Sequence, residues 1–294
     1  MYFAVDPLNL AEVSTRLIEL VSANPKANWT AVVDGAFDHD GGRRDYPGSP
    51  EALYACDELD AMLEVSPLLI PLIVERAEVL REQILGLARH CAGRPMFSIV
   101  ASSRNAAELK PNWQKCARVS TEDGQKLLLR FADTRVLPML PEVLRQESWA
   151  ALTHELSEWW YVDRAGQLDQ VPVVEAIAAP VFPLALGRRE FNKLLERGEP
   201  DSVIDAMFRQ LPGILPATAK AGFFEKIKAV CEFARAQEID AFPDILALGI
   251  FDTRTDHKGL TNPKLLRLIA ERGWVRGELA AAIEAVNGVN AVNQ

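Results

Sequence analysis

The sequence predicts an α+β protein: an N-terminal mixed β-sheet with packed helices, followed by an all-α C-terminal domain. Up to about residue 170, apolar runs of strand length alternate with amphipathic helical segments and then with hairpins. Beyond Gly187 the periodic segments have helical spacing only, and a proline-containing apolar stretch precedes them. We therefore expect an α/β domain over residues 1–170, a linker over 171–186 and a helical domain over 187–294.

The first hundred residues are expected to alternate between helices and strands. Asp6-Pro7 is a favourable helix start, since Asp can cap and Pro suits the first turn. Asn105 and Glu108 have the spacing of a capping box, and Pro111 is expected to kink or divide the helix that follows. The expected strands are residues 29–37, 68–74 and 96–102, with a short helix over 53–63 and an amphipathic helix over 75–91.

Two hairpins are predicted next. The first turns at Glu122-Asp123-Gly124, because an Asp-Gly pair accepts the positive φ angles of tight turns, and its second strand is expected over residues 126–131. The second spans residues 158–168 and turns at Arg164-Ala165-Gly166. Residues 134–144 between them are expected to be helical, broken by prolines.

Six helices are expected in the C-terminal part, one of them capped by Asp201 and another opened by Asn262-Pro263. Their expected ranges are residues 191–196, 201–211, 223–235, 244–251, 263–269 and 275–286.

The composition excludes several classes of protein. The chain has 294 residues, of which 49% are hydrophobic and 25% charged, as in ordinary globular proteins. A formal net charge of −9 argues against a nucleic-acid binder, which needs a basic surface. The N-terminus lacks the features of a secretory signal, and the apolar run at 68–74 is too short to span a membrane. Four cysteines without a CxxC pair fit the reduced thiols of a cytoplasmic protein.

Known catalytic motifs are missing from the sequence. There is no G-x-S-x-G elbow, no cysteine-protease motif and no glycine-rich phosphate loop, so we expect a protein that is not an enzyme and has no cofactor. One loop collects possible metal ligands, namely Asp38, His39, Asp40 and Asp45. A solvated surface loop explains these turn-forming residues better, so we expect no metal site there.

A charged corner follows the first hairpin, where Arg130, Asp133 and Arg135 surround Phe131 and the end of an apolar strand. These charges could orient a partner-binding edge. Alternatively they form an internal brace, in which Asp133 caps a helix beginning near Thr134 and an arginine neutralises it. We favour the brace, because unpaired charge at the end of an apolar strand is costly to bury.

Three adjacent aromatic residues, Trp159, Trp160 and Tyr161, lie in the second hairpin. Successive side chains of a strand point to opposite faces, so at least one of these rings should lie on the outer face. Aromatic rings are enriched at binding hot spots, and we name the three as candidate partner-binding residues. Alternatively, the three rings are buried beneath the linker or the helical part, and we weigh this alternative equally.

Four short segments occur in the order and spacing of a known family. They are residues 31–36 (AVVDGA), residues 66–72 (SPLLIPL), Ser102-Ser103 followed by Ala107-Glu108-Leu109, and residues 127–141 (LLLRFADTRVLPMLP). Together they resemble the type VI secretion effector adaptors, also called effector chaperones or Tap/Tec proteins. The last segment is similar to the family's RFYDPRVL signature, although Ala132 and Thr134 replace its frequent Tyr and Pro.

This resemblance implies a bacterial cytoplasmic adaptor. Such proteins bind a cognate toxic effector, or its N-terminal region, and load it onto the VgrG-type spike protein. The alternatives are a metal-dependent hydrolase that uses the loop from Asp38 to Asp45, and an immunity protein that inhibits an effector.

Overall fold

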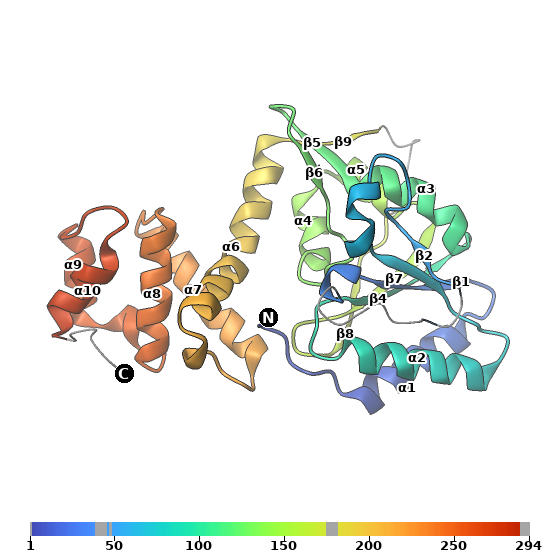
Figure 1. The fold of residues 1–294 in the computed structure, drawn as a ribbon, viewed down its shortest axis with the longest axis horizontal. Coiled ribbons are helices and arrows are strands. Elements are labelled where there is room, and N and C mark those ends of the chain that lie inside the picture. Colours follow the sequence, from blue (N-terminus) through green and yellow to red (C-terminus); the bar gives the residue numbers. More distant parts are fainter. Residues whose placement is uncertain (1, 39–45, 47–48, 175–181, 289–294) are drawn as a thin grey trace. The chain divides into compact units, whose positions relative to one another are not determined.

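The computed structural model describes residues 2–38, 46, 49–174 and 182–288. The chain divides into two compact units, Val5–Glu196 and the pair of segments Met1–Ala4 and Arg197–Gln294. The first is built on β-sheets and the second is helical, which confirms the predicted α+β class (Figure 1). The domain bounds proposed from the sequence stay a prediction.

A six-stranded sheet forms the centre of the first unit. Its strand order is β2 (Glu51–Ala52), β3 (Leu68–Pro71), β1 (Asn28–Val33), β4 (Phe97–Ser102), β7 (Leu156–Val162) and β8 (Leu168–Val171). Every pairing in this sheet is antiparallel. All six residues of β4 are buried, and so are five of the six in β1, because helices cover both faces of the sheet there.

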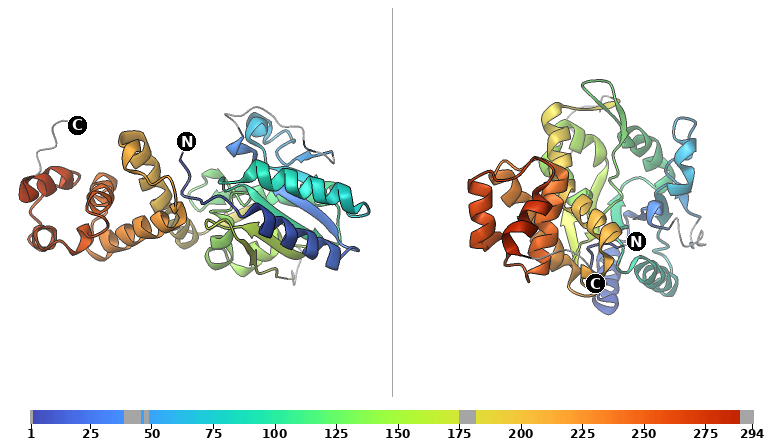
Figure 2. Two further views of the ribbon diagram at one scale, coloured as in Figure 1. Left: turned by 90° about the horizontal axis from the view of Figure 1, so that it is seen from below. Right: turned by 60° about the vertical axis from the view of Figure 1, so that its left-hand side comes forward.

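One face of the sheet is covered by α1 (Leu10–Ala23) and α2 (Ala77–Cys91), which lie side by side (Figure 2). The opposite face packs against α3 (Ala106–Ala117) and α5 (Gln146–Leu152), the latter a helix that the sequence did not predict. On this second face the Trp159 ring is stacked between Trp113 and Trp149, with centroid separations of 5.5 and 6.1 Å.

A second, three-stranded sheet has the order β6 (Lys126–Leu128), β5 (Arg118–Thr121) and β9 (Leu184–Leu186). The predicted hairpin is confirmed, with Gly124 at a φ of 82° in its turn. β6 ends earlier than expected, at Leu128. β9 runs parallel to β5, although the sequence placed residues 184–186 in a linker.

Some local predictions were wrong. Asn9, rather than Asp6, caps α1. The helix expected over 53–63 is replaced by turns after β2 and by the 3-10 helix η2 (Asp60–Val65). By contrast, the broken helical stretch predicted over residues 134–144 is confirmed from residue 137 on, as the short η3 (Leu137–Met139) and α4 (Leu140–Val143), which follow a turn.

Prolines interrupt the helices less than expected. α3 is continuous through Pro111. The confirmed Asn105–Glu108 capping box anchors its start, and Trp113 on its inner face is fully buried in the core. The two helices expected over residues 191–211 are one helix, α6 (Arg188–Gln210), which continues through Pro200.

The helical unit contains α7 (Lys220–Ala236), α8 (Phe242–Arg254), α9 (Pro263–Ala270) and α10 (Leu279–Asn287), packed on one apolar core with the later part of α6. Buried Asp244 accepts hydrogen bonds from Trp274 Nε1, Gly277 N and Leu279 N, and it thereby fixes the segment before α10. Within the described ranges, no helix is both long and apolar enough to cross a membrane.

Candidate functional site

The end of β1 forms one side of the candidate site. Asp34 is buried, and its Oδ1 accepts a hydrogen bond of 3.0 Å from Ala36 N, which caps the 3-10 turn η1 (Gly35–Phe37). A Cβ on Gly35 would collide with the carbonyl oxygen of Ser66, so this turn and the segment before β3 approach too closely for a side chain. The first two of the four short segments are therefore in contact.

The charged corner after β6 packs onto Asp34. Arg130 Nη2 lies 2.9 Å from Asp34 Oδ2 and 3.5 Å from Asp133 Oδ2. Arg135 contacts Asp133 with two nitrogens, Nε at 3.0 Å from Oδ1 and Nη2 at 2.7 Å from Oδ2. Asp133 Oδ1 also accepts a hydrogen bond of 3.0 Å from the backbone N–H of Arg135. Both carboxylates of the corner are thus engaged by arginine.

The Phe37 ring supports both arginines. The Arg130 and Arg135 guanidinium carbons each lie 5.3 Å from its centroid, within the range of a cation–π interaction. Phe131 of the signature points the other way, into the core, where it meets Trp113 and Trp159 edge-on. The corner is also tied to the start of β4, since Asp34 N donates to Met96 O and Thr134 N to Pro95 O.

Burial controls the electrostatics of Asp34. Burial raises the pKa of the Asp34 carboxyl, the charge of Arg130 opposes this, and the charge of Asp133 reinforces it. Burial together with the nearby Asp34 charge also raises the pKa of Tyr54 to about 12. These shifts accompany a desolvated ion-pair cluster whose outer arginine, Arg130, keeps 40% of its side-chain surface exposed.

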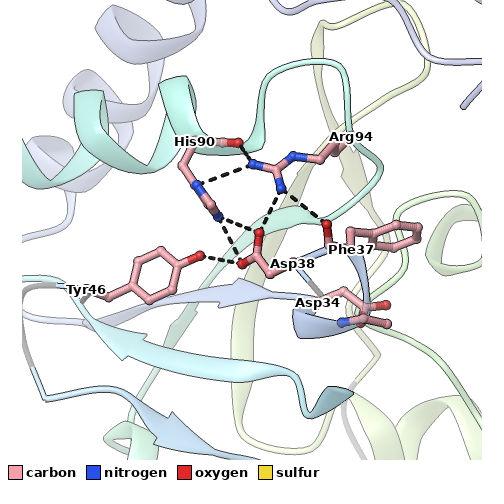
Figure 3. A network of polar contacts seen from close by, with 7 residues as sticks. Asp34, Phe37, Asp38, Tyr46, His90 and Arg94 are labelled. Carbon is pink, nitrogen blue, oxygen red and sulfur yellow. Dashed lines mark hydrogen bonds and ion pairs between the residues drawn. The ribbon is translucent and has the colours of Figure 1, made fainter. Parts of the chain in front are cut away.

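A second polar network lies beside the first, around Asp38 (Figure 3). Its carboxylate is 2.8 Å from His90 Nε2 and 2.7 Å from Arg94 Nη1, and Tyr46 donates its hydroxyl at 2.9 Å. Arg94 also donates to the carbonyl oxygens of Phe37 and His90, so it joins the end of α2 to η1. Tyr46 packs edge-on against the His90 ring, at a centroid distance of 5.4 Å.

This network stabilises the charged form of Asp38. Burial opposes the charge, but hydrogen bonds from His90 and Tyr46, and then the electrostatic effects of His90 and Arg94, lower the pKa of the carboxyl. The same burial and the adjacent Asp38 raise the pKa of Tyr46. Sequence reasoning singled out Asp38 but not its partners, because Tyr46, His90 and Arg94 come from other parts of the chain.

The other members of the predicted metal loop, His39, Asp40 and Asp45, lie outside the described residues. Among the residues that the structure describes, no group of three or more His, Cys, Asp or Glu side chains could hold a metal ion. The Asp38 carboxylate already forms an ion pair with the Arg94 guanidinium.

The three aromatic residues of β7 divide between the faces of the sheet, as the period of a strand requires. Trp159 and Tyr161 are buried on the α3 side, and Tyr161 donates to Asp169 at 3.0 Å. Trp160 is half-buried on the α1 and α2 side and donates to Glu158 at 2.7 Å. Of the three, only Trp160 keeps substantial accessible surface, and their role in partner binding stays a prediction.

Comparison with known proteins finds one family model that matches part of the chain. The model described as "Domain of unknown function (DUF4123)" matches residues 29–151. This segment runs from β1 to α5 and includes all four short segments and the charged corner. No curated protein and no solved structure matches the chain.

Proposed function

We propose that this chain is a non-enzymatic adaptor that binds a cognate type VI secretion effector and loads it onto a VgrG-type spike protein in a bacterial cytoplasm. One observation carries the proposal: the Asp34–Arg130 ion pair joins the first and last of the four segments that resemble this family. The match of residues 29–151 to a domain family over the same segments supports it.

The geometry of the corner favours a scaffold over a catalytic centre. Asp34, Asp133 and Asp38 each contact arginine, and Phe37 packs beneath two guanidinium groups. A catalytic acid or base must reach a substrate proton, whereas these carboxylates are held by internal partners. Fixed charges that lock the end of β1 to the corner after β6 suit a protein whose surfaces must keep their shape for binding.

The proposal divides the binding between two surfaces. A sheet edge of the first unit would capture a segment of the effector, because an open edge can add an extended strand. The helical unit would contact the spike protein. The acidic net charge of −9 is compatible with electrostatic steering toward basic partner surfaces.

Co-expression with the products of neighbouring genes tests the function. We expect the full chain to co-purify with a large effector and with a spike protein, and its deletion to abolish secretion of that effector alone. Failure to bind either protein would overturn the proposal. Rescue of growth from the effector's toxicity, with no effect on secretion, would identify an immunity protein instead.

A further inference from the structure

An apolar groove lies in the first unit beside the β5–β6 hairpin. It has a volume of about 630 Å³. Its apolar lining comes from three segments that are distant in the sequence: η2 and the residue before it, the hairpin, and residues 182–183. The large apolar side chains that line it are Leu59, Met62, Val119, Leu127, Leu128 and Phe182.

The lining is only partly covered. Met62 keeps 41% of its surface exposed, and Leu127 and Leu128 are half-buried, whereas Leu59 and Val119 are buried and form the floor. Exposed apolar side chains gathered around a hollow of this size are typical of a binding surface.

The rim of the groove is basic although the chain is acidic. Lys115, Arg118 and Lys126 lie on it with a single acid, Glu58, so positive charges outnumber negative ones by two. Glu58 pairs with Arg118 at 2.9 Å, and the Lys115 ammonium lies 5.5 Å from the centroid of the Phe182 ring. Lys126 is exposed at the edge. The local charge therefore complements an acidic ligand, opposite to the net charge of the protein.

One wall of the groove is a strand edge that no other described strand pairs with. β6 is the outer strand of its sheet. Thr121 N donates to Gln125 O, and Leu129 N donates to Ala117 O, so the odd-numbered residues of this strand face β5. Since backbone groups alternate in direction along an antiparallel strand, the N–H and C=O of Lys126 and Leu128 point to the open side. An incoming extended segment can pair with them there.

We infer that this groove binds an extended acidic segment of a partner protein, which adds as a strand to β6. Its apolar side chains enter the groove, and its carboxylates, which alternate with them along the added strand, lie beside Lys126 at the open edge. The inference rests on the proposed function in one respect, since the segment would belong to the effector. It names the chemistry of that segment: alternating apolar and acidic residues in an extended conformation.

Synthetic peptides test the recognition directly. The probe is a short fluorescein-labelled peptide in which leucine and glutamate alternate, closed by proline at both ends so that it does not pair with itself. We expect saturable binding in fluorescence anisotropy that weakens with added salt. A peptide with lysine in place of glutamate should not bind, and equal binding of the two peptides would overturn the inference.

Methylation of peptide nitrogens tests strand addition. One peptide carries N-methyl groups on its leucine amides and another on its glutamate amides. Alternate N–H groups of an added strand face β6, so one peptide should lose binding and the other should keep it. Equal affinity of both would contradict pairing with β6.

A matched pair of variants locates the site. Lys126→Glu reverses an exposed charge on the rim, and we expect it to weaken the binding of the acidic peptide about fivefold or more. Lys26→Glu makes the same change at an exposed lysine before β1 and should leave the affinity unchanged. Equal affinities for the two variants would overturn the assignment. A dimer of the wild-type chain in sedimentation that Lys126→Glu dissociates would also overturn it, since a second copy would then occupy the groove.

Capture of the full effector separates this inference from the adaptor function. If Lys126→Glu captures the effector as well as the wild-type chain does, the groove assignment fails and the adaptor function stands. If the acidic peptide binds with the expected dependence on Lys126 while no effector is captured, the adaptor function fails and the groove stands.

Discussion

Arg130 Nη2 lies 2.9 Å from Asp34 Oδ2, and the two residues are 96 positions apart in the sequence. The pair joins the end of β1 to the corner after β6, and Asp133 and Arg135 extend it into a cluster of four charges. The cluster bridges separate segments, and single substitutions in it measure how much it contributes to stability.

Removal of Asp133 should destabilise the fold. Asp133→Ala leaves Arg135 without its two-nitrogen contact and removes the acceptor for the Arg135 backbone N–H. We expect the free energy of unfolding to fall by about 2–3 kcal/mol, less than for a fully buried pair because Arg130 is partly solvated. Denaturant titration measures this change. The control Asp57→Ala alters an exposed aspartate, and a loss as small as the control's would show that the brace is weak.

Gly35 should not tolerate a side chain. In Gly35→Ala the new Cβ would collide with the Ser66 carbonyl oxygen, so β1 or the segment before β3 must shift. We expect a loss of about 1–3 kcal/mol, as for an overpacked core. Gly86→Ala in α2 is the matched control. Nothing lies within 4 Å of its added Cβ, and better helix propensity should stabilise it by about 0.5–1 kcal/mol. Thermal melts of both variants measure the change in stability. Equal stability of the two variants would refute the close approach of Gly35 to Ser66.

The Asp38 network should contribute to acid sensitivity. The pKa of Asp38 is lowered in the folded chain, so the native state binds its proton less tightly than the unfolded state does. Its stabilisation is present above the ordinary carboxyl pKa of 3.8 and is lost as the pH falls through the lower folded value. Asp38→Asn should therefore be less stable at neutral pH and show a flatter loss of stability below pH 3.8. Denaturant titrations across this range measure it, and parallel curves would contradict the assignment.

Divalent cations should leave the melting temperature unchanged. Arg94 and His90 already contact the Asp38 carboxylate, so a metal ion would have to displace them. Thermal melts with Mg²⁺, Ca²⁺, Mn²⁺ or Zn²⁺ measure this, since a ligand that binds only the native state raises its stability. A rise that grows with the metal concentration and that Asp38→Asn abolishes would favour the metal-dependent hydrolase.

Local rules accounted for some elements and failed at others. The Asn105–Glu108 capping box, the Asn262 cap and the turn at Gly124 were predicted because each depends on residues a few positions apart. Pro111 does not divide α3, because the surrounding core holds the helix together more strongly than one missing hydrogen bond weakens it.

The sequence by itself determined the α+β class, the hairpins and the presence of charge beside Phe131. Only the tertiary structure decided that Asp34 is the partner of Arg130, that β9 pairs with β5, and that Asp38 is held by Arg94. The physical reason is the distance along the chain between the residues that interact. A cap or a turn gains its energy from neighbours in the chain, whereas an ion pair between distant segments forms only after the sheet and its helices have brought them together.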